Sequence, residues 1–327
     1  MNIGLEITKN SQKYSKLLGR LQQNLDEPEK FNFIHLKTRS DTMEKINSLN
    51  VLVSYGIDEK TFNLRSESLR WIHFGTAGID HCLSKSVLGS KVIISNSIGI
   101  HAQPIAEFVI GMILYFFKQF PGAIKFMNSS EWSQWDLAKK IIHCHTQTVG
   151  IIGYGNIGKA IAKQAKALGM KVIATRRLQK KIETKKIVDE LRPMSDLKFL
   201  LSNSDVVVIS CPLTPLTRGM ISKKEISMMK KTSYLINISR GEILDEEDLI
   251  EALKNKKIAG AGLDVFAKEP LSSESELFKL DNVFLTPHIS GNFPGYQERV
   301  IDVFADNLNR FSKNKSIKNR VCKKRQY

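Results

Sequence analysis

Three polar residues whose types suit acid–base and anion chemistry follow apolar runs in the second half of the chain. Arg240 stands in Ile-Ser-Arg-Gly-Glu, Glu269 in Lys-Glu-Pro-Leu, and His288 in Thr-Pro-His-Ile. An arginine can bind a carboxylate through two charge-assisted hydrogen bonds and polarise a carbonyl. A histidine can donate a proton near neutral pH, and a carboxylate beside its ring stabilises the protonated form. Each of these residues alone is typical of an ordinary polar loop, so a catalytic interpretation depends on what accompanies them.

A glycine-rich segment upstream of these residues predicts a nucleotide site. Residues 148–158 read Thr-Val-Gly-Ile-Ile-Gly-Tyr-Gly-Asn-Ile-Gly, so a Gly-x-Gly-x-x-Gly pattern follows a strand and opens a helix. The first glycine allows a tight turn, the second lets a pyrophosphate approach the backbone, and the third lets the helix pack closely on the strand. The N–H groups of the first helical turn then bind the phosphates. We expect a dinucleotide to contact Gly153, Tyr154, Gly155, Asn156, Ile157 and Gly158.

The end of the next strand indicates which dinucleotide is bound. An NAD site usually has an acidic residue about 20 residues after the glycines, where it holds the ribose hydroxyls. This chain has Thr175, Arg176 and Arg177 there instead. Two guanidinium groups without a carboxylate suit the 2′-phosphate of NADP. The sequence therefore predicts NADP as the cofactor, with NAD held by other contacts as the alternative.

Two series of short apolar runs alternate with segments of helical periodicity, which is typical of parallel sheets covered by helices on both faces. The first series of expected strands is Ile3–Ile7, Phe31–Leu36, Val51–Tyr55, Trp71–Phe74 and Val92–Ser95. The second is Val149–Ile152, Val172–Thr175, Val206–Ile209, Leu235–Ile238, Ala261–Val265 and Val283–Leu285. Long helices are expected over Pro104–Lys118 and Tyr296–Phe311. We predict an α/β protein with two open parallel-sheet domains and a cleft between them. Residues 1–98 and 291–327 would form a substrate domain, and residues 99–290 a dinucleotide-binding domain.

Composition limits the class of protein. The chain has 327 residues, 42% hydrophobic and 25% charged, as in an ordinary globular protein. No apolar run reaches the roughly 18 residues that cross a bilayer, and no secretory signal opens the sequence. The four cysteines lack Cys-x-x-Cys spacing, which favours a reducing, cytoplasmic location without a disulfide framework. We expect no membrane partner.

The formal net charge of +16 raises the question of a nucleic-acid partner. Fourteen of the 49 basic residues lie in two stretches, Lys171–Lys186 and Lys313–Arg325, with seven in each. The first stretch contains the arginines assigned to the cofactor. The second has one aromatic residue nearby, Tyr327 at the end of the chain, and so offers no stacking platform for bases. We expect a solvated, frayed terminus there and no nucleic-acid partner.

The motifs together resemble the D-isomer-specific 2-hydroxyacid dehydrogenases, which include glyoxylate and hydroxypyruvate reductases. The resemblance runs from about Gly75 to Gly291 and rests on the stretches at 212–217, 239–241, 264–271 and 286–288. It implies two Rossmann-like domains, usually in a homodimer. It also implies reduction of a small 2-keto acid, of the glyoxylate, hydroxypyruvate or branched type, to a D-2-hydroxy acid.

The resemblance implies a role for each of these residues. Arg240 would bind the substrate carboxylate and polarise the carbonyl, while His288, supported by Glu269, would protonate the alkoxide. The backbone of Thr76, Ala77 and Gly78 would meet the substrate carboxylate. Pro212, Thr217, Ile238 and Asp264 would border the cofactor, with Asp264 at the nicotinamide end.

Some features depart from that pattern or leave alternatives open. Pro104 stands where many members have a Ser or Thr facing the nicotinamide. His143, Cys144 and His145 suggest a metal site, but alternating neighbours cannot all face one ion, so we expect none. Trp132 and Trp135 are expected at a dimer contact. The rival interpretations are a dinucleotide-sensing corepressor without turnover and a phosphoglycerate, phosphite or formate dehydrogenase.

Overall fold

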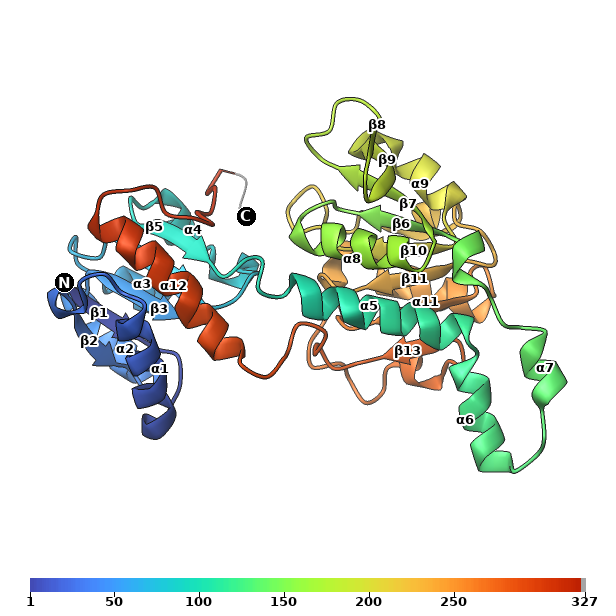
Figure 1. The fold of residues 1–327 in the computed structure, drawn as a ribbon, viewed down its shortest axis with the longest axis horizontal. Coiled ribbons are helices and arrows are strands. Elements are labelled where there is room, and N and C mark those ends of the chain that lie inside the picture. Colours follow the sequence, from blue (N-terminus) through green and yellow to red (C-terminus); the bar gives the residue numbers. More distant parts are fainter. Residues whose placement is uncertain (325–327) are drawn as a thin grey trace. The chain divides into compact units, whose positions relative to one another are not determined.

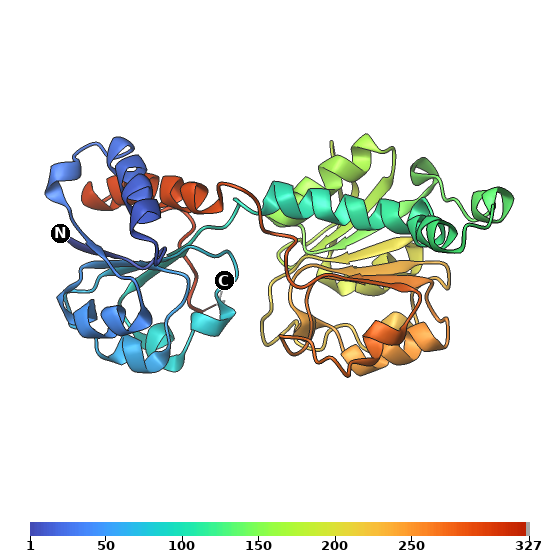
Figure 2. The same cartoon turned by 90° about the horizontal axis from the view of Figure 1, so that it is seen from below.

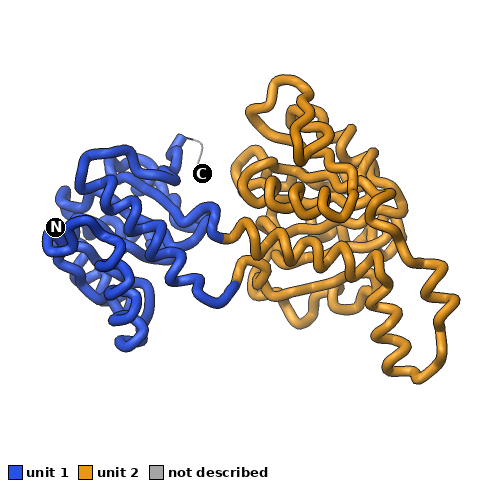
Figure 3. Tube along the Cα trace, viewed as in Figure 1, with its two compact units in different colours: residues 1–100, 293–327 blue, residues 101–292 orange. Residues whose placement is uncertain are grey.

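The structure, a computed structural model, describes residues 1–324 of the chain. It divides into two compact units, shown in Figure 3. Unit 1 comprises Met1–Ile100 and Phe293–Tyr327, and unit 2 comprises His101–Asn292. These boundaries lie two residues from the expected ones. Each unit is an open, mainly parallel sheet with helices on both faces (Figures 1 and 2), so the predicted fold class is confirmed.

Unit 1 is built on five parallel strands. Their order is β2 (Asn32–His35), β1 (Asn2–Leu5), β3 (Val51–Ser54), β4 (Trp71–Phe74) and β5 (Ile93–Asn96). Figure 2 shows α1 (Ser11–Gln23) and α12 (Tyr296–Ser312) together on one face of the sheet. The other face is covered by α2 (Arg39–Lys45), α3 (Glu59–Asn63) and α4 (Lys85–Gly89). The return of the chain from unit 2 therefore supplies one of the two long helices of unit 1.

Unit 2 has eight strands. Their order is β13 (Val283–Leu285), β12 (Gly260–Leu263), β11 (Tyr234–Asn237), β10 (Val206–Ile209), β6 (Thr148–Ile152), β7 (Lys171–Arg176), β9 (Val188–Pro193) and β8 (Glu183–Lys185). All neighbours are parallel except β8, which is antiparallel to β9. The chain winds outward in both directions from β6, so the strand order reverses between β6 and β10. In open α/β sheets, ligands bind at the carboxyl ends of the strands at such a reversal.

The helices of unit 2 and the short 3-10 helices complete the fold. In unit 2 the helices are α5 (Ala102–Phe117), α6 (Phe120–Ser129), α7 (Gln134–Ala138), α8 (Asn156–Ala167), α9 (Leu197–Asn203), α10 (Lys223–Ile226) and α11 (Glu246–Lys254). The 3-10 helices of both units are Pro28–Lys30, Ile46–Ser48, Asp80–Cys82, Cys144–Thr146, Met194–Asp196, Gly241–Ile243 and Glu276–Lys279. The β8–β9 hairpin was not predicted, because its strands are largely polar and only Val188 and Leu191 are buried.

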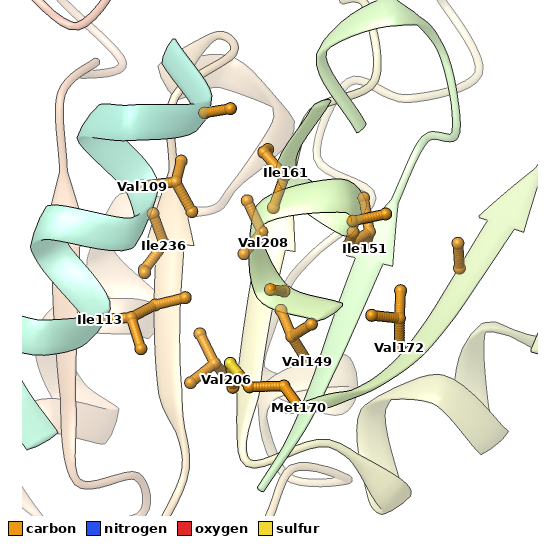
Figure 4. Close-up of a cluster of buried hydrophobic side chains, with 14 of the residues drawn as sticks. Val109, Ile113, Val149, Ile151, Ile161, Met170, Val172, Val206, Val208 and Ile236 are labelled. Carbon is orange, nitrogen blue, oxygen red and sulfur yellow. The ribbon is translucent and has the colours of Figure 1, made fainter. Parts of the chain in front are cut away.

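The core of unit 2 explains why the central strands are continuous apolar runs. Val206, Val207, Val208 and Ile209 of β10 are all fully buried, because helices cover both faces of the sheet. Figure 4 shows one face, where Val109 of α5 and Ile161 of α8 lie over the strands. The opposite cluster includes residues of α9 and α11. These layers hold the carboxyl ends of the strands in a fixed arrangement.

Helix α5 is the most apolar helix of unit 2, and seven of its sixteen residues are buried. Helix α6 follows at an angle and buries none of its residues. Among residues 1–324, no single helix has the length and apolar character needed to span a membrane. Helices α5 and α6 meet that test only as a pair, bent by 59°.

The expectation of a frayed basic terminus is wrong for residues 313–324. Ile317 and Val321 are buried in the core of unit 1, with 7% and 5% of their surfaces exposed. The N–H of Val321 donates to the carbonyl of Ile94 at 2.9 Å, which attaches the segment to the last strand. Two apolar side chains four residues apart thus outweigh the charge of the segment around them. Arg325, the last residue of the basic stretch, lies outside the described residues.

Candidate active site

The three glycines of the loop differ in what an added side chain would meet. Gly153 has φ +103°, and a Cβ there would lie 2.7 Å from the backbone nitrogen of Cys211. A Cβ on Gly158 would lie 2.2 Å from the carbonyl oxygen of Gly153. A Cβ on Gly155, in contrast, would meet no atom within 4 Å. Gly153 and Gly158 are therefore required by the fold itself, whereas Gly155 leaves open space where a ligand can approach the backbone.

The loop leads into the first turn of α8, which carries no side-chain cap. Its N-cap is Gly155, and no acidic residue occupies the first turn. In α1 and α11, by contrast, Asn10 and Asp245 accept hydrogen bonds from N–H groups of the first turn. The exposed Asn156 and the half-buried Ile157 begin α8. Uncapped N–H groups and the positive end of the helix dipole fit a phosphate, so these residues can hold a dinucleotide.

The end of β7 places the two arginines at the surface. Arg176 and Arg177 are exposed, while Thr175 is fully buried and its hydroxyl has no hydrogen-bond partner in the part of the chain that the structure describes. Tyr154 is also buried, and that burial raises the pKa of its phenol, against an opposing effect of the Arg176 charge. Of the side chains expected near the ribose, the two arginines are thus the accessible ones.

The loop after β10 is closed on itself by a threonine. The Thr217 hydroxyl donates to the Pro212 carbonyl at 2.7 Å and accepts from the Thr214 N–H at 2.8 Å. Pro212 is exposed, whereas Ile238, which follows β11, has 5% of its surface exposed. The first segment follows β10, at the reversal of strand order, and Ile238 follows the neighbouring strand β11. They lie at the same sheet edge as the glycine loop.

His288 and Glu269 form a close pair. Nδ1 of His288 lies 2.7 Å from Oε2 of Glu269, and both side chains are partly exposed, at 47% and 37%. Oε1 of Glu269 accepts from the Phe266 N–H at 3.1 Å, which orients the carboxylate. Because the carboxylate is bound at Nδ1, Nε2 is the nitrogen left to exchange a proton with a ligand. The arrangement can therefore hold a protonated imidazole and present its proton outward.

His288 adopts a backbone conformation that needs support, with φ +54°. The support comes from Asp264, which follows β12 and is fully buried. Its carboxylate accepts from the Thr286 hydroxyl at 2.7 Å. It also accepts from the N–H groups of Ile289 and Ser290 at 2.8 and 3.0 Å. Asp264 thus fixes the turn that carries His288.

Arg240 is half-buried after β11, and local hydrogen bonds hold the backbone and side chain of this residue. Its Nη1 donates to the Ser239 carbonyl at 2.8 Å. The side chain of Asn237, which is fully buried, donates to the Arg240 carbonyl at 3.0 Å and accepts from the Ser239 N–H at 3.1 Å. At Gly241, a Cβ would lie 1.8 Å from the backbone carbon of Phe266. The Arg240 loop and the loop that leads to Glu269 thus pack backbone to backbone.

A second histidine of unit 2, His101, is unsuited to donate a proton. It lies at the start of α5, and burial lowers its pKa to about 4. Its ring is therefore neutral at pH 7. This leaves His288 as the better donor of the two.

The predicted substrate loop lies in unit 1. Thr76, Ala77 and Gly78 are half-buried after β4. The loop is held by the Asn96 side chain, which donates to the Ala77 carbonyl at 2.8 Å, and by the Thr76 hydroxyl, which donates to the Gly78 carbonyl at 3.1 Å. The structure thus brings His288 and Glu269 together in unit 2, and places the Thr76–Gly78 loop in the other unit.

Sequence reasoning missed Asn237 and did not foresee that Asp264 holds the turn of His288. Both are fully buried polar residues at or just after the end of a strand, where a polar side chain interrupts an apolar run. A buried polar residue requires hydrogen-bond partners, and the backbone of the following turn supplies them. That interruption was the available signal.

Comparison with known proteins identifies relatives of this chain. The sequence model of the D-isomer specific 2-hydroxyacid dehydrogenase NAD binding domain matches residues 110–290. A glyoxylate reductase of Pyrococcus horikoshii is 34% identical over 279 residues, which cover 83% of this chain and 81% of the relative. That of Thermococcus gammatolerans is 35% identical over 278 residues, covering 83% and 82%.

The fold of a solved structure is also similar. The NADPH-dependent glyoxylate/hydroxypyruvate reductase of Sinorhizobium meliloti, solved with NADP and sulfate, superimposes with a TM-score of 0.84. The match covers 100% of this chain and 99% of that one at 23% sequence identity. At 23% sequence identity, this similarity shows that the two proteins share a fold.

We predict that Asp264→Asn destabilises unit 2. The asparagine amide makes the acceptor of these hydrogen bonds neutral, and its NH₂ group faces a donor where a carboxylate oxygen accepted before. The free energy of unfolding should therefore fall by about 1.5–3 kcal/mol. The measurement is the free energy of unfolding in urea. The control is Asp281→Asn, because the Asp281 side chain is 90% exposed and should tolerate the change. Equal stability of the two variants would contradict the role of Asp264 in holding the turn.

Proposed function

Because the chain belongs to the D-isomer-specific 2-hydroxyacid dehydrogenase family, we propose that it reduces small 2-keto acids to D-2-hydroxy acids with NADPH as the preferred reductant. The observation that carries the proposal is the 2.7 Å contact between His288 and Glu269. The pair lies at the same edge of the unit 2 sheet as the glycine loop, because all these loops follow carboxyl ends of parallel strands. A proton donor at the edge that binds a dinucleotide fits carbonyl reduction.

Each residue has a defined part in the proposed reaction. The dinucleotide, when bound, supplies a hydride to the carbonyl carbon. Arg240 binds the carboxylate and stabilises the negative charge that develops on the carbonyl oxygen. His288 donates the proton on Nε2 to that oxygen, while Glu269 stabilises the protonated ring and fixes its orientation. In unit 1, we propose that the backbone N–H groups of Thr76–Gly78 donate hydrogen bonds to the substrate carboxylate.

The relatives support the substrate class and the cofactor. The two archaeal proteins are glyoxylate reductases, which favours glyoxylate, hydroxypyruvate and similar small or branched 2-keto acids. The similar Sinorhizobium meliloti structure holds NADP, as the exposed Arg176 and Arg177 would favour here. NAD remains the alternative cofactor. A corepressor-like protein without turnover would be favoured by a broken triad, but Arg240, Glu269 and His288 are all present.

A cytoplasmic location is part of the proposal. Cys82, Cys144, Cys211 and Cys322 are all free thiols in the structure. Burial raises the pKa of the Cys82 thiol to about 11 and that of Cys211 to about 12, so both stay protonated and unreactive. Four free thiols suit a reducing compartment.

A homodimer is proposed from the surface of the arm formed by α6, α7 and their connection, residues 120–138, which projects from unit 2 in Figure 1. The arm exposes large apolar side chains, with Met127, Trp132 and Trp135 exposed at 74%, 80% and 69%. Several large exposed apolar side chains on one arm are typical of an interface. We propose that a second copy of the chain covers it.

The test of function is a panel of glyoxylate, hydroxypyruvate, pyruvate and branched 2-keto acids with NADPH and NADH. We expect reduction of at least one acid, and Arg240→Ala should lower kcat/KM by roughly 10³-fold because it removes a bidentate ionic anchor. Arg218→Ala, which removes an exposed arginine paired with Glu242, is the matched control. Cofactor binding without turnover of any acid would favour the sensing protein instead.

Glu269→Gln should lower kcat by about 10- to 100-fold with little change in KM, because the charge of Glu269 matters when His288 is protonated. Without that charge the ring loses its proton more easily, so the decline of the reduction rate with rising pH should begin at a lower pH. The pH profile of kcat measures this effect. Glu274→Gln, at an exposed site, should leave the profile unchanged. An unaltered profile in Glu269→Gln would exclude the proposed pairing.

Arg176→Asp should reduce the preference for NADPH over NADH by roughly 10- to 100-fold, since it replaces a charge-assisted contact to the 2′-phosphate by repulsion. The ratio of kcat/KM for the two cofactors measures the preference, and added salt should reduce it in the wild type. Lys186→Asp makes a similar charge change at an exposed position after β8 and should have a smaller effect. A wild type with equal efficiency for both cofactors would contradict the NADP assignment.

Trp132→Ser combined with Trp135→Ser should shift the mass in solution from twice 37.0 kDa to the monomer value. Light scattering during gel filtration measures the mass. Leu178→Ser, which alters an apolar side chain that is 60% exposed outside the arm, should leave the dimer intact. A wild-type chain that is monomeric at high concentration would refute the dimer.

A further inference from the structure

The proposed reaction makes no use of the His143-Cys144-His145 segment. A 3-10 helix begins at Cys144, and His143 just before it is extended, with φ −87° and ψ 125°. Both histidines are exposed, whereas Cys144 is 8% exposed and packs into the core of unit 2. The thiol therefore points away from the two rings. Cys144 is thus excluded from any site that the histidines form.

The two imidazoles converge on one another. Nδ1 of His143 lies 3.0 Å from Nδ1 of His145, the ring centroids are 4.9 Å apart, and the ring planes cross at 84°. At this distance one ring nitrogen can donate a hydrogen bond to the other, and the tautomers decide which ring is the donor. Two imidazole nitrogens at this separation are also close enough to bind one metal ion together.

The backbone around the pair is fixed from both sides. The Ile142 N–H donates to the Phe117 carbonyl at 2.9 Å, and the Lys118 ammonium donates to the Ile142 carbonyl at 2.9 Å. The Thr146 hydroxyl donates to the His143 carbonyl at 2.9 Å. These contacts attach the segment to the end of α5 and close its own turn. The histidines are therefore presented by an ordered support, which reduces the entropy lost when a ligand binds.

The separation of the nitrogens indicates a coordination geometry. With a metal–nitrogen distance of about 2.1 Å, two nitrogens 3.0 Å apart subtend an angle of about 90° at the metal. That angle belongs to adjacent ligands in square-planar, tetragonal or octahedral complexes. Tetrahedral zinc would place the nitrogens roughly 3.4 Å apart at the same bond length. The geometry thus favours Cu²⁺ or Ni²⁺, which prefer tetragonal nitrogen and oxygen ligands, over Zn²⁺.

We propose that His143 and His145 form a surface chelate that binds one Cu²⁺ or Ni²⁺ ion per chain through their Nδ1 atoms. Within residues 1–324, no group of three or more His, Cys, Asp or Glu side chains is arranged to hold a metal, so water completes the coordination. The segment precedes β6, and the glycine loop follows it, so the chelate lies at the opposite edge of the sheet from the candidate active site. It is independent of the proposed reaction.

The test uses the full chain without an affinity tag, freed of metal by a chelator and titrated with Cu²⁺, Ni²⁺ or Zn²⁺ alone. Calorimetry should give one Cu²⁺ per chain, with affinity in the order Cu²⁺, Ni²⁺, Zn²⁺. The electron paramagnetic resonance spectrum of the Cu²⁺ form should be axial, with splitting from two nitrogens. A single coupled nitrogen, or Zn²⁺ bound more tightly than Ni²⁺, would overturn the proposed geometry.

Variants locate the ion. His143→Gln or His145→Gln should each weaken Cu²⁺ binding by on the order of 10²-fold, because the second imidazole acts within the same molecule. His81→Gln, which changes an exposed histidine of unit 1, is the matched control and should bind as the wild type does. The variant that combines His143→Gln with His145→Gln still contains His288 and the other histidines. Undiminished Cu²⁺ binding by this double variant would place the ion at another site and refute the chelate. Turnover of a 2-keto acid should be unchanged in both single variants and in the double variant.

Discussion

The buried carboxylate of Asp264 is the interaction on which the candidate active site depends. It is fully buried and accepts three hydrogen bonds from Thr286, Ile289 and Ser290. Between these partners lies His288, whose left-handed backbone conformation costs roughly 1–2 kcal/mol. Hydrogen bonds to a charged acceptor contribute about 1.5–3 kcal/mol each, which is enough to impose that conformation. The histidine therefore reaches Glu269 because a neighbouring strand end holds its turn.

The same principle operates at the other loops of unit 2. Asn237, buried at the end of β11, bonds to the backbone around Arg240. Gly241 permits a backbone contact with Phe266 that any side chain would block. The polar side chains at the strand ends are thus positioned by buried neighbours, and the exposed residues are left for chemistry. This division explains why Asp264, which holds the turn of His288, has no exposed surface.

Basic side chains of the chain make specific local contacts. In the terminal segment, Lys313 pairs with Asp26 at 2.6 Å and Lys318 with Asp306 at 3.0 Å. Lys323 donates to the Ser90 carbonyl at 2.7 Å, and partial burial, together with nearby arginines, lowers its pKa. Exposed pairs of this kind add little stability, so the buried Ile317 and Val321 hold the segment. The other basic stretch carries the arginines proposed to bind the cofactor phosphate.

The fold class, the two strand series, the glycine loop and the family could all be predicted from the amino-acid sequence. These follow from local patterns, because apolar runs between helices specify covered parallel strands and Gly153 and Gly158 are sterically required. The β8–β9 hairpin, the packing of Ile317 and Val321, and the hydrogen bonds of Asp264 emerged from the three-dimensional structure. It also brought Nδ1 of His143 within 3.0 Å of Nδ1 of His145. The terminal packing and the role of Asp264 depend on partners distant in sequence, the hairpin depends on the pairing of its polar β9 with β7, and the histidine contact depends on ring orientation. None of these is encoded in the periodicity of a single segment.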